Sequence, residues 1–89
     1  MSRFTLISET IEVRGQQITV RELTSKQKGD WAKAAQADVY SAPYMLVALV
    51  CEPGVSADEA AGWPADVVER IVDVARRLSG MDSDDEKKD

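Results

Sequence analysis

The 89-residue sequence predicts an α+β domain in which a small N-terminal antiparallel sheet packs on three or four helices. Apolar and polar residues alternate through the first quarter of the chain, as in strands with one buried face. From residue 24 onward, apolar residues recur at helical spacing. The last residues are almost entirely polar or charged, so folding would bury too little apolar surface there to offset the entropy of ordering them. We therefore predict a single domain over residues 1–80 and a disordered acidic tail over residues 81–89.

Two strands joined by a tight turn are predicted in the first quarter. The apolar positions of their alternating pattern are Ile11, Val13, Ile18 and Val20. Gly15 lies between the two runs and can adopt the positive φ that a hairpin turn requires. The apolar residues within 4–7 suggest a third short strand before the hairpin. Because two strands alone are only marginally stable, we expect the apolar face of this sheet to pack on helices.

Four helical segments are predicted after the strands. They cover residues 25–37, 44–51, 57–61 and 65–79. Thr24 or Ser25 can cap the first, because a hydroxyl accepts hydrogen bonds from free amides of the first turn. Pro43 suits the first turn of the second helix, which is apolar all round and is expected at the centre of the core. Gly80 stands where a left-handed C-cap would end the last helix.

The last helix is predicted to present an apolar stripe on one side and charged residues on the other. Asp66 with Arg70, and Asp73 with Arg77, have the i,i+4 spacing of ion pairs on a helix surface. The whole chain has 11 basic and 16 acidic residues and a net charge of −5. Because acidic residues interleave with the arginines, we interpret this charged side as a solvated face and predict no nucleic-acid binding.

The sequence offers little catalytic chemistry. It contains no histidine, the side chain best suited to proton transfer near neutral pH, and no Gly-rich phosphate loop. Its one cysteine, Cys51, lies in an apolar run and is interpreted as a small buried hydrophobe of a protein in a reducing cytoplasm. The acidic residues within 82–86 lack the glycine and the final glutamate of a calcium loop. We therefore expect a non-catalytic protein with no cofactor, no metal, no signal peptide and no membrane-spanning segment.

Three phrases, in order, carry a resemblance to a known family. Residues 18–24 (ITVRELT) are similar to a "V-x-E-L-T" motif that leads from the hairpin into the helices. Residues 51–59 (CEPGVSADE) resemble a "P-x-hydrophobic-T/S-x-E/D-E" turn, and residues 62–68 (GWPADVV) resemble a "hydrophobic-P-x-x-hydrophobic-hydrophobic" helix start. In this order the phrases resemble the small tail assembly chaperones of long-tailed bacteriophages and their prophages.

The resemblance implies a partner and a location. Such a chaperone binds the long, helical tape measure protein in the bacterial host cytoplasm and shields its hydrophobic stripes until tail tube subunits assemble around it. The tail tube protein is a second candidate partner, and the sequence leaves the oligomeric state open. In many members, a −1 ribosomal frameshift near the end of the gene gives a longer product. Lys87 and Lys88 fit an A-rich slippery run there, an idea that the codons for residues 86–88 would test.

The client surface is expected to include exposed aromatic side chains and the outer part of the last helix. The candidate residues are Tyr40, Tyr44, Trp63, Arg70 and Arg77. Trp63, next to Pro64 on a loop, is expected to be more exposed than Trp31, which is placed on the inner side of the first helix with Ala34 and Ala35.

Two other functions stay open at this point. A small acidic inhibitor that mimics DNA would need its carboxylates to form one continuous face, and its binding would weaken steeply with salt. A structural head–tail connector would be present in finished phage particles, whereas a chaperone would be absent from them.

Overall fold

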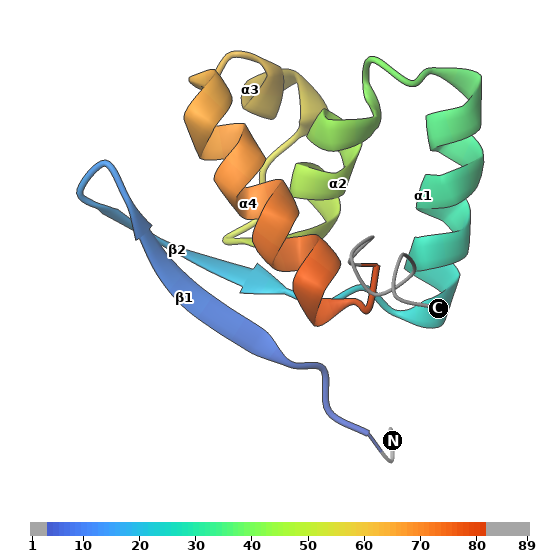
Figure 1. The fold of residues 1–89 in the computed structure, drawn as a ribbon, viewed down its shortest axis with the longest axis horizontal. Helices are drawn as coiled ribbons and strands as arrows, with labels where there is room; N and C mark the ends of the chain where they lie inside the picture. Colours follow the sequence, from blue (N-terminus) through green and yellow to red (C-terminus); the bar gives the residue numbers. More distant parts are fainter. Residues whose placement is uncertain (1–3, 82–89) are drawn as a thin grey trace, which may run out of the picture.

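The computed structural model describes residues 4–81 and confirms the predicted α+β fold. The elements, in chain order, are β1 (Ser8–Val13), β2 (Gln16–Arg21), α1 (Ser25–Ala37), α2 (Ala42–Val50), β3 (Cys51–Glu52), α3 (Ala57–Ala61) and α4 (Ala65–Leu78). Figure 1 shows the hairpin of β1 and β2 on one side of the molecule and α1 on the other, with α2 between them.

The three strands form one antiparallel sheet in the order β1-β2-β3. In the hairpin, Ser8 pairs with Arg21 at one end and Val13 with Gln16 at the other. The two-residue loop between them is Arg14-Gly15, and both residues have positive φ, 53° and 80°. Two consecutive positive φ values are typical of the type I′ turn, whose twist matches that of the flanking strands. The hairpin prediction is therefore confirmed, with Arg14 joining Gly15 in the left-handed region.

The third strand differs from the prediction. Residues 4–7 form no strand and are exposed, whereas Cys51 and Glu52 pair with Val20 and Thr19 of β2. A strand of this sheet needs both a neighbour and a face to bury. The Ile7 carbonyl accepts a hydrogen bond from the Glu22 N–H at 2.9 Å, but residues 4–7 are exposed and bury no face. Cys51 has both, since it directly follows α2 and its side chain lies in the core. The second helix accordingly ends at Val50, one residue earlier than predicted.

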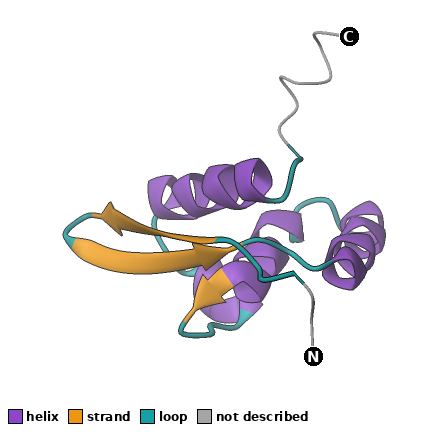
Figure 2. Cartoon of the chain, turned by 90° about the horizontal axis from the view of Figure 1, so that it is seen from below, coloured by secondary structure: helices purple, strands orange, loops and turns teal. Residues whose placement is uncertain are grey.

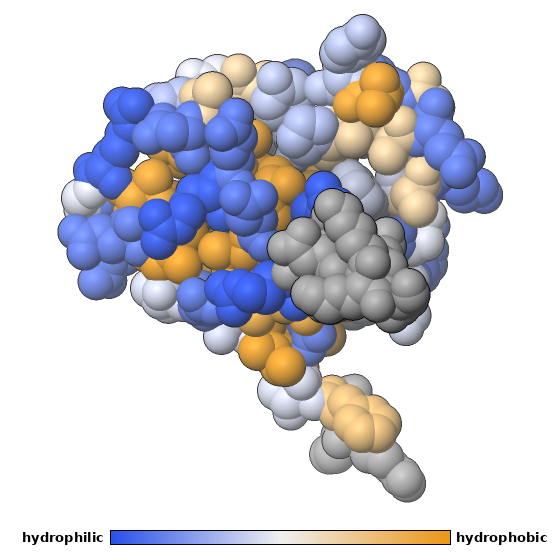
Figure 3. Space-filling view, in the orientation of Figure 1, coloured by the Kyte–Doolittle hydropathy of each residue, from blue (hydrophilic) through white to orange (hydrophobic). Residues whose placement is uncertain are grey.

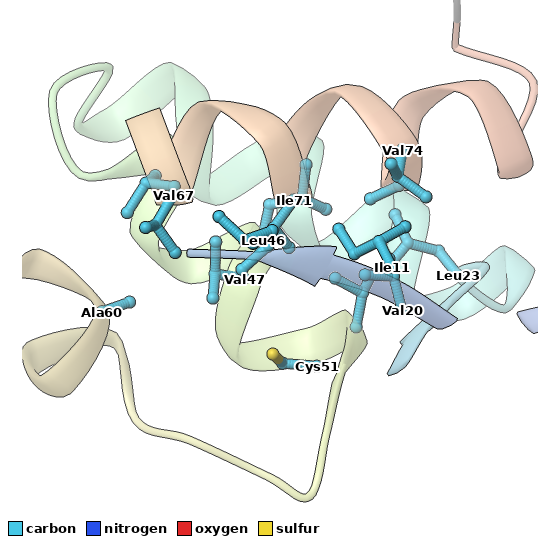
Figure 4. Close-up of a cluster of buried hydrophobic side chains, with 14 residues drawn as sticks. Ile11, Val20, Leu23, Leu46, Val47, Cys51, Ala60, Val67, Ile71 and Val74 are labelled. Carbon is cyan, nitrogen blue, oxygen red and sulfur yellow. The ribbon is translucent and has the colours of Figure 1, made fainter. Parts of the chain in front are cut away.

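The core lies where α4 crosses the sheet and α2. Figure 4 shows Ile71 and Val74 of α4 close to Ile11 and Val20 of the hairpin, with Leu46 of α2 beside them. The largest fully buried side chains are Leu46, Ile71, Val20, Val47 and Val50. Three of these five belong to α2, which agrees with its prediction as the central helix.

The first helix packs much more loosely. It buries none of its residues, although Trp31, Ala34 and Ala35 are half-buried on the predicted inner side. Its N-terminus is well capped, because Thr24 and Gln27 each accept a hydrogen bond from the other's backbone N–H. Both views place α1 at the edge of the molecule, away from the hairpin (Figures 1 and 2).

The predicted ion pairs within the last helix do not form. Arg14 at the hairpin turn donates two hydrogen bonds to the carboxylate of Asp66, at 2.9 and 3.2 Å. Arg77 donates to Glu9 of β1 at 2.9 Å. The hairpin lies beside α4, so each long arginine side chain reaches a carboxylate across the interface, and a two-bond arginine–carboxylate contact is geometrically favoured. The charged side of α4 is thus partly a contact with the sheet rather than a fully solvated face.

The chain leaves α4 through the predicted glycine cap. Gly80 has φ +72°, and the Met81 N–H donates to the Arg76 carbonyl at 2.7 Å. Met81 is half-buried against the core, so the folded part extends one residue beyond the predicted boundary. The rest of the predicted acidic tail, residues 82–89, lies outside the described residues. Within residues 4–81, no helix is both long and apolar enough to cross a membrane.

Candidate functional site

Two shallow hollows meet at the side chain of Trp63. The first, which we call the α4 groove, has a volume of about 270 Å³, and its walls include Tyr44, Trp63, Val68, Glu69, Val72 and Asp73. The second, the hairpin groove, has a volume of about 340 Å³, and its walls include Val13, Arg14, Gln16, Ile18, Trp63 and Val67. Most of the residues that line each groove are apolar, and each lining also includes at least one charged residue.

The turn between α3 and α4 holds Trp63 in this position. The Gly62 and Trp63 N–H groups donate to carbonyls of α3, at 3.0 Å to Glu59 and 3.1 Å to Ala60. Pro64 then begins α4 as its N-cap residue, with φ −58°. Backbone hydrogen bonds on one side and a proline on the other fix the course of the chain here, so the indole is presented by a well-defined turn.

The structure brings together two of the five candidate residues. Tyr44 and Trp63 line the same groove and are both half-buried against the core. Tyr40 is 86% exposed on the turn between α1 and α2, and it lines neither groove. Arg70 is exposed on α4 and also lies outside both grooves, whereas Arg77 is paired with Glu9. Trp63 is half-buried, as is Trp31, so the expected contrast in their exposure is small.

Sequence reasoning missed the part of the α4 groove that α4 itself supplies. Ala65, Val68, Glu69, Val72 and Asp73 recur at intervals of three, four, seven and eight residues, which places them along one side of a helix. The spacing of these five residues in the sequence is the signal that could have identified this side of the groove. The apolar stripe predicted for α4 is wide enough to reach the surface beside α2. Figure 3 shows hydrophobic atoms between charged side chains over α4.

The carboxylates near the grooves differ in their partners. Asp66 accepts hydrogen bonds from Arg14, and these together with the nearby positive charge hold the pKa of Asp66 below its ordinary value of 3.8. Glu69 and Asp73 belong to none of the four ion pairs formed among residues 4–81. The α4 groove therefore has two exposed carboxylates that take part in no ion pair within residues 4–81.

The described part of the chain buries few groups that could react or bind a metal. Cys51 is 5% exposed, which agrees with its interpretation as a buried hydrophobe, and desolvation raises the pKa of its thiol. Among residues 4–81, no polar or charged residue is buried and no group of three metal-ligating side chains gathers. The surface chemistry that this arrangement offers is the capture of apolar side chains in the two grooves.

No protein-family model matches the chain, and no curated protein or solved structure matches it either. Function is therefore inferred from the residues and from the two grooves.

Proposed function

We propose that this chain is a phage tail assembly chaperone that binds the tape measure protein in the host cytoplasm without catalysis. The observation that carries the proposal is the pair of apolar grooves meeting at Trp63. The identity of the client comes from the resemblance of three phrases in the sequence to the chaperone family.

The size of the grooves suits a helical client. Small-molecule sites usually enclose about 300–1,000 Å³, so these solvent-open hollows of 270 and 340 Å³ lie just below and just above the lower limit. Each has room for one or two large side chains. An amphipathic helix presents such side chains at i, i+3, i+4 and i+7, and it binds by placing them in grooves of this kind.

The charge distribution favours a chaperone over a DNA mimic. Four carboxylates, those of Glu9, Asp30, Glu52 and Asp66, are each paired with an arginine or lysine. These pairs weaken the continuous negative field that mimicry of DNA requires. The net charge of −5 would at the same time help to keep a complex with an apolar client soluble.

Co-expression with the tape measure protein encoded downstream tests the proposal. We expect the client to be soluble and to co-elute with this chain in size-exclusion chromatography at both low and high salt. The Trp63→Ala variant should lose the client, whereas Tyr40→Ala should keep it, because Tyr40 is an exposed aromatic outside both grooves. Circular dichroism would confirm that both variants fold. Val72→Gln is a second substitution in the α4 groove that should also weaken client binding.

A client that stays insoluble in the presence of the wild-type chain would contradict the proposal. Binding that disappears at high salt would favour the DNA-mimic alternative, and recovery of the chain in finished particles would favour the connector.

A further inference from the structure

The α4 groove has an apolar floor and an acidic rim on the same helix. Val68 and Val72 are one turn apart, and so are Glu69 and Asp73, each acid following a valine directly. Residues four apart on a helix lie on the same side, so the two carboxylates form a short row parallel to the two valines. From Ala65 to Asp73 the groove follows about 12 Å of α4, at 1.5 Å per residue.

The ion pairs of the fold include neither carboxylate of this acidic rim. Arg77, four residues after Asp73, turns away from it to pair with Glu9 of β1. Arg14, the arginine nearest the start of α4, is taken by Asp66. None of the four ion pairs among residues 4–81 includes Glu69 or Asp73, and both acids are exposed. A partner that brings a positive charge to this rim therefore meets two carboxylates that form no ion pair within residues 4–81.

Two aromatic side chains also line the groove. Tyr44 comes from the first turn of α2 and Trp63 from the turn before α4, so the floor is bounded by two different elements. A partner side chain entering here contacts valine and aromatic carbon while its neighbours one turn away reach the carboxylates.

We infer that the α4 groove binds an amphipathic helix that carries lysine or arginine one turn from its apolar anchor residues. The inference rests on the proposed function and deepens it, since it specifies which segments of the client this groove would accept. The two carboxylates attract a basic flank and repel an acidic one, so charge selects among helices whose apolar stripes are otherwise equivalent.

Three labelled helical peptides of equal length test the inference through fluorescence anisotropy. They share one leucine stripe and differ only at two flanking positions, which hold lysine, glutamine or glutamate. We expect the lysine peptide to bind most tightly and the glutamate peptide least, by about tenfold overall at low salt, with the difference shrinking as salt rises. In the E69K/D73K variant the order of the three peptides should reverse.

The matched control is E12K/D58K, which changes the net charge equally at two exposed acids outside both grooves. It should keep the wild-type order, and circular dichroism should show all variants folded. Equal binding of the three peptides would overturn charge selection while leaving a groove that binds helices. If no peptide binds although the tape measure protein still co-elutes, the α4 groove is the wrong site. Failure of both experiments would overturn the proposed function as well.

Discussion

The last helix and the first helix are almost equal in length, yet they are held in the molecule very differently. α4 has 14 residues and buries five of them against the sheet and α2, whereas α1 has 13 residues and buries none. Both begin at a clear local signal, a proline for α4 and a capping box for α1. Capping therefore determines where each helix begins, whereas a broad apolar stripe determines whether the helix packs against the core.

The same difference predicts unequal local stability. A segment with few buried contacts opens at a lower free energy than the core, even in a domain that unfolds cooperatively overall. α1 is anchored mainly through Trp31, whose indole N–H donates to the Ala42 carbonyl at 2.8 Å. We therefore expect α1 to open without α4, while α4 opens only with the whole domain.

The largest expected effect comes from the α4 core. Ile71 is fully buried, so Ile71→Ala should lower the free energy of unfolding by about 2–5 kcal/mol through lost burial and a new cavity. Val39→Ala, after α1 at a position 66% exposed, should change it by less than about 0.5 kcal/mol. Urea denaturation followed by circular dichroism measures both. Similar losses in the two variants would contradict the proposed difference between the regions.

A second substitution separates the two helices directly. Trp31→Phe keeps an aromatic ring but removes the hydrogen bond to Ala42, which should lower the opening free energy of α1 by about 1–3 kcal/mol. Hydrogen exchange should show faster amide exchange in α1 and unchanged exchange in the centre of α4. Trp63→Phe is the control and should leave α1 unaffected. Equal acceleration in both helices would show that α1 does not open independently.

Glycine substitutions in α1 and in the hairpin turn are expected to change the stability of the domain in opposite directions. A methyl group at Gly29 of α1 meets no atom within 4 Å, so Gly29→Ala should stabilise that helix by about 1 kcal/mol. Gly15 has φ +80° at the hairpin turn, so Gly15→Ala should destabilise the domain. Thermal unfolding of the two variants reports both signs. A gain at residue 15 or a loss at residue 29 would mean that these backbone conformations are assigned incorrectly.

The smallest effect concerns the ion pair at the hairpin turn. The hydrogen bond from Arg14 lowers the pKa of Asp66, so the folded state binds fewer protons than the unfolded state as the pH approaches that value. The stabilisation is present above the ordinary pKa of 3.8 and is lost as the pH falls through the lower, folded value. Asp66→Asn should thus slightly reduce the urea midpoint near neutral pH and leave it unchanged in strong acid. Asp58→Asn, at an exposed acid that belongs to none of the four ion pairs within residues 4–81, is the matched control variant.

Local chemistry explains which parts of the fold were predictable. The hairpin turn at Gly15, the cap at Thr24 and the end at Gly80 each depend on neighbours within four residues, and each was found from the sequence. The strand at Cys51 depends on Val20, far away in the chain, and no local pattern marks it. The alternation within residues 4–7 resembles a strand locally, but these residues are exposed and bury no face against the core.

The candidate site was likewise predictable only where it depends on residues that are close in the sequence. Tyr44 and Trp63 were predicted as aromatic residues of the client surface, and the structure places them in the same groove. Arg77 has the correct i,i+4 spacing to Asp73, yet it pairs with Glu9, because the hairpin offers a carboxylate that helix spacing alone cannot reveal. The unpaired state of Asp73 follows from this contact between α4 and the hairpin, so it could not be predicted from helix spacing.

The strand order has a consequence for how this chain reaches its native state. β1 and β2 meet across a two-residue turn, whereas Val20 and Cys51 meet only after about thirty residues have been brought round in a loop. Because the entropic cost of closing a loop rises by about 0.6 kcal/mol for each doubling of its length, the hairpin closes far more easily than the β2–β3 pair. α1 and α2 both lie inside the longer loop. We therefore expect the hairpin to act as an early template during folding, and the addition of β3 to fix both helices in place as a late step.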